Sequence, residues 1–147
     1  AYDPPAAHPG IPVVIDGAVS AARAAIEESG KDPDLVVLTG WSWPRMDRLE
    51  AAVHAAVLGE RAADVPVILL GPAVGSTEAA SGPLGAAVAL RAMAEGRVPG
   101  WTTLIDPIAE WKGPQQQETA EVAMESALVL SFSLEGSHAA LTLEKAR

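Results

Sequence analysis

The chain has 147 residues, with 10 Lys and Arg, 19 Asp and Glu, a net charge of −9 and no cysteine. With 49% hydrophobic and 20% charged residues, it is too apolar to be disordered, and its length suits a single domain. Its acidity argues against binding to nucleic acids or anionic membranes, because phosphate would be repelled. The lack of cysteine excludes a disulfide framework and a cysteine nucleophile in this chain.

The proline-rich residues 1–12 predict an extended N-terminal arm, and residues 13–147 predict one domain. Alternating helical and strand patterns in that domain indicate a layered α/β fold with buried strands. The predicted helices cover 14–29, 46–58 and a third segment that begins near Ser81, a possible cap, and ends at 95–96; the predicted strands cover 35–38, 65–70, 101–105, 127–132 and 138–143, with a glycine-rich turn at 71–76, a loop at 106–117 and a tight turn at 134–137.

The third helix carries one charge, Arg91, between residues 84 and 94. A helix that is apolar all round is normally buried all round, which favours a central helix covered by a second layer. The alternative is an alanine-rich helix that lies on the sheet with one side in water, since alanine is only mildly hydrophobic. Under the favoured interpretation, small and aliphatic residues form a partner interface: Leu84, Gly85, Val88, Ala89 and Ala92.

Three segments together resemble the β-ketoacyl synthases of fatty-acid and polyketide assembly. Residues 75–82 (GSTEAASG), followed by the small-residue helix and GRVP at 96–99, are similar to that family's Gly-His-Thr-x-x-Ala-Ala-Gly segment. Residues 38–44 (LTGWSWP), with Asp47 and Glu50, resemble its His-Gly-Thr-Gly-Thr-Pro segment with the Asp and Glu that follow. Residues 131–140 (SFSLEGSHAA) resemble its Ser-Phe-Gly-Phe-Gly-Gly-x-Asn segment. The resemblance covers only the C-terminal half of a synthase.

The resemblance implies half of a thiolase-like αβαβα fold, with a mixed sheet and a central helix that the other half covers. In the family, two histidines act with a cysteine of the other half, and a lysine precedes the second histidine. The corresponding positions here are Thr39, Ser76 and Gly71. A hydroxyl donates a hydrogen bond but is no general base near neutral pH, so no residue is assigned a catalytic role. The resemblance implies that a cavity is lined by Trp41, Trp43, Ser76, Thr77, Leu134 and His138, with the two indoles where the family has small residues.

The remaining candidate residues favour structural roles. The histidines His8, His54 and His138 lack metal-ligand spacing, and no metal or cofactor is expected. His54 lies beside the apolar stripe of its helix and is interpreted as a surface or hydrogen-bonded histidine. Trp101 and Trp111 flank the 106–117 loop and are interpreted as its anchors.

The favoured function is therefore a non-catalytic, chain-length-factor-like subunit of polyketide or fatty-acid biosynthesis in the cytoplasm. It would pair with a ketosynthase-type protein or with the missing N-terminal half, as a hetero- or homo-oligomer, and the pathway implies an acyl carrier protein as a further partner. One alternative is an acyl-transfer or condensing enzyme subunit whose site, lined by Thr39, Ser76 and His138, is completed by a second chain. Another is a free-standing binding module that uses the loop at Gly71.

Overall fold

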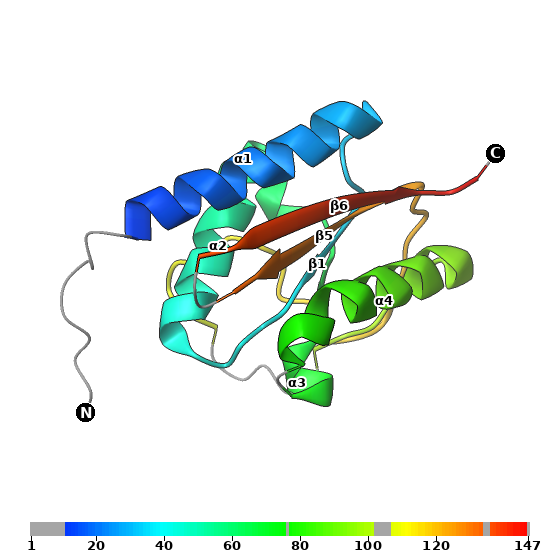
Figure 1. Ribbon diagram of the computed structural model, residues 1–147. Coiled ribbons are helices and arrows are strands. Elements are labelled where there is room, and N and C mark those ends of the chain that lie inside the picture. The colour runs from blue at the N-terminus through cyan, green and yellow to red at the C-terminus, as the bar shows by residue number, and fades with distance from the viewer. Residues whose placement is uncertain (1–10, 76, 102–106, 134–135, 147) are drawn as a thin grey trace.

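A four-stranded mixed sheet forms the centre of the computed structural model, which describes residues 11–75, 77–101, 107–133 and 136–146. The strand order is β2-β1-β5-β6 (Figure 1). Strand β1 runs parallel to β2 and β5, and β6 runs antiparallel to β5. The strands are β1 (Leu35–Leu38), β2 (Val67–Leu69), β5 (Ser126–Phe132) and β6 (His138–Glu144). This arrangement confirms the predicted α/β fold class with a mixed sheet.

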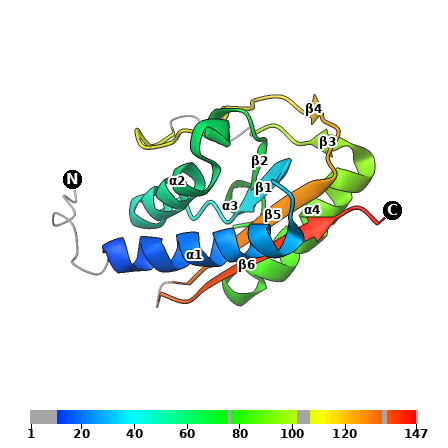
Figure 2. The ribbon, with the colours of Figure 1, turned by 90° about the horizontal axis from the view of Figure 1, so that it is seen from above.

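Helices cover both faces of this sheet (Figures 1 and 2). Helices α1 (Ile11–Ser29) and α2 (Pro44–Leu58) pack on one face, and α4 (Ser81–Glu95) packs on the other. In β1, Val36 and Leu38 face α1 and α2, whereas Leu35 and Val37 face α4. Successive side chains of a strand point to opposite faces. All four are buried because helices cover both of these faces. The continuous apolar run of β1 follows from this double coverage.

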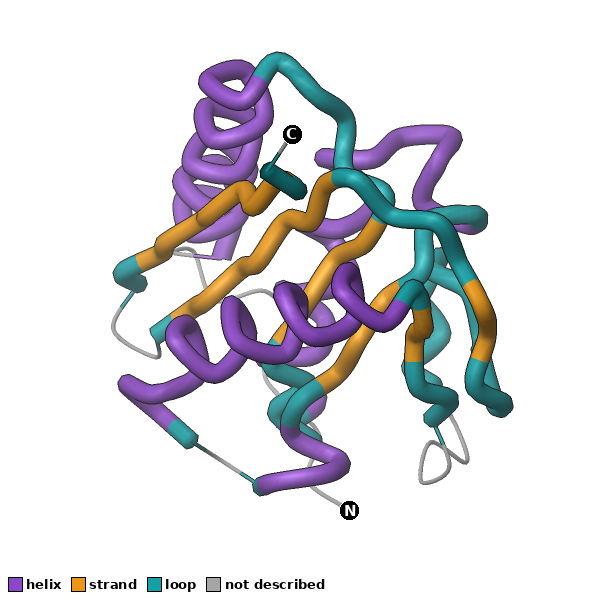
Figure 3. The backbone as a smooth tube through the Cα atoms, turned by 90° about the vertical axis from the view of Figure 1, so that its right-hand side faces the viewer, coloured by secondary structure: helices purple, strands orange, loops and turns teal. Residues whose placement is uncertain are grey.

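Short elements complete the chain. They are the 3₁₀ helices η1 (Gly59–Ala63) and η2 (Glu78–Ala80), the one-turn helix α3 (Gly71–Val74), and the strands β3 (Arg97–Val98) and β4 (Ala120–Glu121). Strands β3 and β4 pair antiparallel in a separate sheet, apart from the four main strands (Figure 3). Neither was predicted, because two residues are too short to show a period. Helix α3 occupies a segment that was predicted as a turn, and Pro72 lies at its start.

The three long helices and the strands at 35–38, 65–70, 127–132 and 138–143 are confirmed, with shifted ends. Helix α1 begins at Ile11, within the arm predicted for 1–12, because proline is tolerated in a first turn, where its missing N–H is not needed. The predicted cap Ser81 is instead the first residue of α4, and its hydroxyl bonds that of Thr77 at 2.8 Å. Of the strand predicted at 101–105, only Trp101 lies within the described residues, and it is not in a strand.

Helix α4 is covered on one side by the sheet of its own chain. Ala89 is fully buried, and Ala92 and Met93 are nearly so. A Cβ added to Gly85 would lie 2.7 Å from Val129 Cγ1, so glycine permits a close approach to β5. Three of the five predicted interface residues, Gly85, Ala89 and Ala92, therefore contact this chain's own sheet. Their assignment to a partner interface is corrected accordingly.

The other side of α4 is exposed at Pro83, Ala87, Leu90 and Ala94 and also carries the ion pair of Arg91 with Glu95, while Leu84 and Val88 are half-buried at its margins. Leu90 is 51% exposed. Within this chain, α4 is thus not buried on all sides, and the arrangement is the predicted alternative of a helix with one side in water. No helix in the described part of the chain is long and apolar enough to cross a membrane.

The two sides of α4 should respond differently to added volume. Ala89→Leu should lower the free energy of unfolding by about 1–3 kcal/mol, because the extra methyl groups have no space against the sheet. Ala87→Leu, on the exposed side, should change it by about 0.5 kcal/mol or less. Urea unfolding followed by circular dichroism measures both values. Equal losses would contradict the orientation of α4.

Candidate functional site

The segment between β1 and α2 is held by a buried carboxylate. Glu50, which is 3% exposed, accepts hydrogen bonds from the backbone N–H of Thr39 at 2.9 Å and of Gly40 at 2.8 Å. Gly40 and Ser42 have positive φ angles of 65° and 55°, so the chain turns sharply here. Glu50 thereby fixes the end of β1 to α2.

Asp47 supports the same turn from one helical turn earlier. Burial raises the pKa of its carboxyl, while the backbone N–H groups of Trp41, Ser42 and Trp43 lower it by a smaller amount. Burial likewise raises the pKa of Glu50 to about 7, against the opposing amides of Gly40 and Thr39 and with a further contribution from the charge of Asp47. Both carboxylates singled out by the resemblance thus serve the backbone of this turn.

The position corresponding to the family's lysine is closed by backbone. The N–H of Gly71 donates to the carbonyl oxygen of Thr39 at 2.6 Å, where α3 begins beside the end of β1. A Cβ added to Gly71 would overlap the carbonyl oxygen of Gly40. Any side chain at residue 71, lysine included, would therefore require this backbone to move.

The predicted cavity residues take separate positions. Thr39 is buried at the end of β1, and Trp41 is half-buried against the core of the α1–α2 face. Trp43 is 43% exposed at the start of α2, and Thr77 bonds to Ser81. Ser76 and Leu134 lie outside the described residues.

His138, the first residue of β6, packs against α1. Its ring lies edge-on to Phe132 with centroids 5.5 Å apart, and its Cδ2 is 3.6 Å from where a Cβ on Gly17 would be. Its buried ring nitrogens have no hydrogen-bond partner among the described residues. Burial lowers the pKa of this imidazole. These contacts describe packing under a helix.

His54 is also buried, being 1% exposed, and its nitrogens have no partner in the described part of the chain. The expectation of a surface or hydrogen-bonded histidine is therefore wrong. Its ring stacks on Trp111 with centroids 4.8 Å apart, and burial lowers its pKa to about 4. Trp111 in turn lies 5.7 Å from Trp101, whose Nε1 donates to Val67 O at 2.9 Å. The last bond agrees with the expected anchoring role of Trp101.

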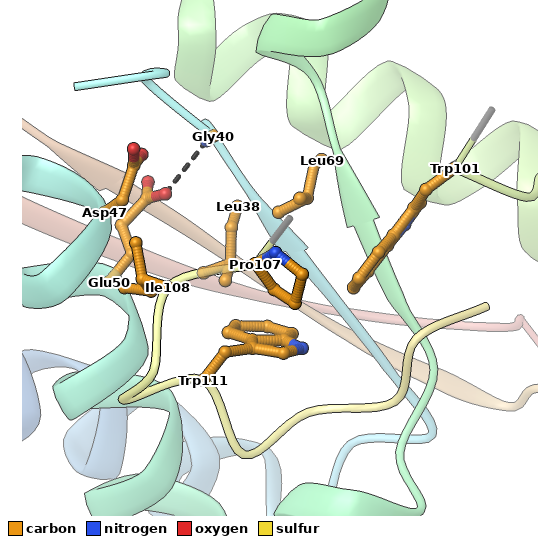
Figure 4. A pocket seen from close by; sticks show the side chains of 9 residues that line it. All are labelled: Leu38, Gly40, Asp47, Glu50, Leu69, Trp101, Pro107, Ile108 and Trp111. Carbon is orange, nitrogen blue, oxygen red and sulfur yellow. Dashed lines mark hydrogen bonds between the residues drawn. The ribbon is translucent and has the colours of Figure 1, made fainter. Parts of the chain in front are cut away.

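An apolar pocket borders this aromatic group and the Glu50 turn (Figure 4). The sequence did not reveal it, because its walls come from segments far apart in the chain. It is lined by Leu38, Gly40, Asp47, Glu50, Leu69, Trp101, Pro107, Ile108 and Trp111. No group of three or more His, Cys, Asp or Glu among the described residues could hold a metal ion. The chemistry of the region is therefore that of apolar packing beside two carboxyl groups.

Glu50 and His54 should give opposite slopes of stability against pH. The raised pKa of Glu50 means that its stabilising contribution is present below pH 4.5 and is lost as pH rises through 7, by about 3 kcal/mol. The lowered pKa of His54 means that its contribution is present above pH 6.5 and is lost as pH falls through 4. Between pH 4.5 and 6.5, Glu50→Gln should therefore make the slope of stability against pH more positive than in the wild type. His54→Phe should make that slope more negative.

Urea unfolding at half-unit pH steps measures these slopes. Slopes unchanged from the wild type in both variants would contradict the buried titrations. Comparing each variant with the wild type cancels the contribution of His138, which both proteins share.

Gly71 and Gly17 form a matched pair of glycine positions. Gly71→Ala should destabilise the chain by more than about 2 kcal/mol, because the added Cβ meets the Gly40 carbonyl oxygen. Gly17→Ala in α1 should be neutral or stabilising by up to about 1 kcal/mol, because its Cβ makes an ordinary contact and alanine favours helix. Thermal unfolding compares the two variants. A Gly71→Ala protein as stable as the wild type would show that the backbone is not closed there.

Comparison with solved structures agrees on the fold. A structure described as a type II PKS acyl-carrier protein in complex with its ketosynthase bound to the hexaketide (AntDE:AntF) matches with a TM-score of 0.80 and 17% identity over 87% of this chain and 32% of the matched chain. The ishigamide ketosynthase/chain length factor matches with a TM-score of 0.78 and 19% identity over 90% and 34%. A β-ketoacyl synthase from Burkholderia phymatum STM815 matches with a TM-score of 0.74 and 22% identity over 88% and 33%. The chain thus spans about a third of the length of these structures.

No curated protein sequence matches the chain. The family model for the β-ketoacyl synthase C-terminal domain matches residues 6–104, which is well over half of the sequence. The matched segment includes the turn held by Glu50, the closed position at Gly71 and the whole of α4. This chain belongs to the family of β-ketoacyl synthase C-terminal domains.

Proposed function

We propose that this chain is a non-catalytic, chain-length-factor-like subunit that pairs with a ketosynthase-type protein in polyketide or fatty-acid biosynthesis. The observation that carries the proposal is the mostly apolar exposed side of α4, where Leu90 is 51% exposed between Ala87 and Ala94, beside the ion pair of Arg91 with Glu95. In the thiolase-like fold a second half covers this helix, and the chain spans about a third of its structural relatives. A partner would therefore bury α4 from the outside while the chain's own sheet covers it from the inside.

The loss of catalytic groups supports a supporting role. Threonine and serine occupy the two histidine positions at residues 39 and 76, and the lysine position at Gly71 is closed by the Gly40 carbonyl. Asp47 and Glu50 are engaged by backbone amides of the turn that they hold. The residues at these positions thus fit packing better than proton transfer. An acyl carrier protein would meet the complete complex, since one of the related structures is described as such an assembly.

Pairing can be tested with one substitution on each side of the molecule. The chain is co-expressed with a cysteine-bearing ketosynthase-type polypeptide of the same source, and the complex is recovered on a tag carried by the partner. Leu90→Arg should abolish recovery, because it places a charge in the centre of the proposed interface. Ala24→Arg is the matched control on the exposed side of α1, across the sheet from α4, and it should leave recovery unchanged.

A monodisperse wild-type chain that never associates would overturn the proposal and favour the free-standing binding module. The same complex also tests the enzyme alternative. If this chain supplied catalytic groups, then Thr39→Val, Ser76→Ala or His138→Ala would reduce the condensation rate of the intact complex. The proposal expects the rate to survive all three changes while the complex stays assembled.

A further inference from the structure

The apolar pocket beside Trp101 and Trp111 has a volume of about 70 Å³ (Figure 4). It lies where the loop at 107–111 crosses the carboxyl ends of β1 and β2. Leu38 and Leu69 contribute carbon from the two strands, and Pro107 and Ile108 contribute carbon from the loop. The two indoles complete the wall, so the interior offers mostly hydrocarbon.

The polar groups around this pocket already have partners. The carboxylate of Glu50 accepts from the amides of Thr39 and Gly40. The indole N–H of Trp101 donates to Val67 O at 2.9 Å, and that of Trp111 donates to Pro114 O at 3.4 Å. A buried water needs two to four polar partners, and these groups leave it few. The pocket therefore favours a hydrocarbon occupant over water.

Glycines and backbone bonds hold the walls in place. A Cβ on Gly113 would overlap the ring of Trp111, so glycine lets the indole lie flat on the backbone. A Cβ on Gly100 would overlap the backbone of Gln117, so residues 100–101 and 116–117 lie directly against each other. The N–H of Trp101 donates to Gln116 O at 2.7 Å between these two stretches of chain. The pocket is thus formed before any ligand arrives, which removes an ordering cost from binding.

The loop is also tied to α2. Arg48 Nε lies 3.1 Å from Glu110 Oε1, and His54 stacks on the face of Trp111. The ion pair is half-exposed and contributes little by itself, but the stacked ring supports the indole from below the pocket wall. Residues 107–111 lie beyond the segment that matches the family model, 6–104. The family model therefore does not describe the wall that these residues form.

From these contacts we infer that the pocket between Trp101, Trp111 and Ile108 binds a small apolar ligand, a short alkyl group of the size of ethyl or propyl. The volume of 70 Å³ corresponds to about two water molecules at ~30 Å³ each, which limits the occupant to this size. The inference rests on the pocket walls alone and is independent of the pairing with a ketosynthase.

Bromoethane is a suitable probe, because a bromine atom held against an indole quenches its fluorescence. The protein carries four tryptophans, so Trp41→Phe with Trp43→Phe leaves Trp101 and Trp111 as the only indoles. Titration of this double variant with bromoethane should give saturable quenching. Quenching that stays linear in bromoethane concentration would be collisional and would overturn the inference.

Two further changes locate the binding. Ile108→Phe in the same background fills the pocket and should abolish the saturable component, whereas Leu141→Phe on the exposed side of β6 should preserve it. Bromoethane should also raise the unfolding temperature of the double variant and of its Leu141→Phe derivative, but not that of the Ile108→Phe derivative. Saturable quenching that persists equally in a folded Ile108→Phe protein would place the probe elsewhere and refute the site. If Ile108→Phe does not fold, Leu69→Phe fills the same pocket from the opposite wall and decides the question.

Discussion

The buried carboxylate of Glu50 is the interaction on which the carboxyl edge of the sheet depends. It joins α2 to the backbone of Thr39 and Gly40, and Gly71 then docks on the carbonyl of Thr39. Strand β1, helix α2 and the start of α3 are thereby fixed within one hydrogen-bonded group. Burying a carboxyl group is costly unless its hydrogen bonds are made, and here the backbone makes them. The turn geometry follows from that requirement.

Under the proposed function, this arrangement explains how family positions persist without the family's chemistry. The Asp and Glu of the resemblance are retained because the turn between β1 and α2 needs acceptors for its backbone N–H groups. The position that the resemblance assigns to the family's lysine is Gly71, against which the backbone closes, so packing leaves no room for a side chain there. On that proposal, the framework of the fold and the reacting groups depend on different residues, so the framework can be kept without the reacting groups.

The strands that helices cover on both faces were predictable from the sequence. Burial of both faces requires a continuous run of apolar residues, such as Leu35–Leu38. Gly96 is likewise a local sequence signal, because glycine readily adopts the positive φ that ends α4 where predicted. The aromatic pocket was not predictable, since His54, Trp101 and Trp111 meet only through tertiary packing. The predicted cavity at Trp41 and Trp43 was inferred from motif positions. Motif positions do not fix the direction of an indole side chain, least of all beside Ser42, whose φ is positive.

Helix α4 shows why composition alone could not decide between the two interpretations of its burial. Its inner side needs small residues, because Gly85 and Ala89 let the helix approach β5 and β1 closely. Its outer side uses alanine as well, and alanine exposes little apolar surface to water, so the chain can be stable with that side uncovered. The same small side chains would let a second layer approach closely. Leu90 is the residue that breaks this symmetry, because a large aliphatic side chain that is half-exposed gains free energy when another surface covers it.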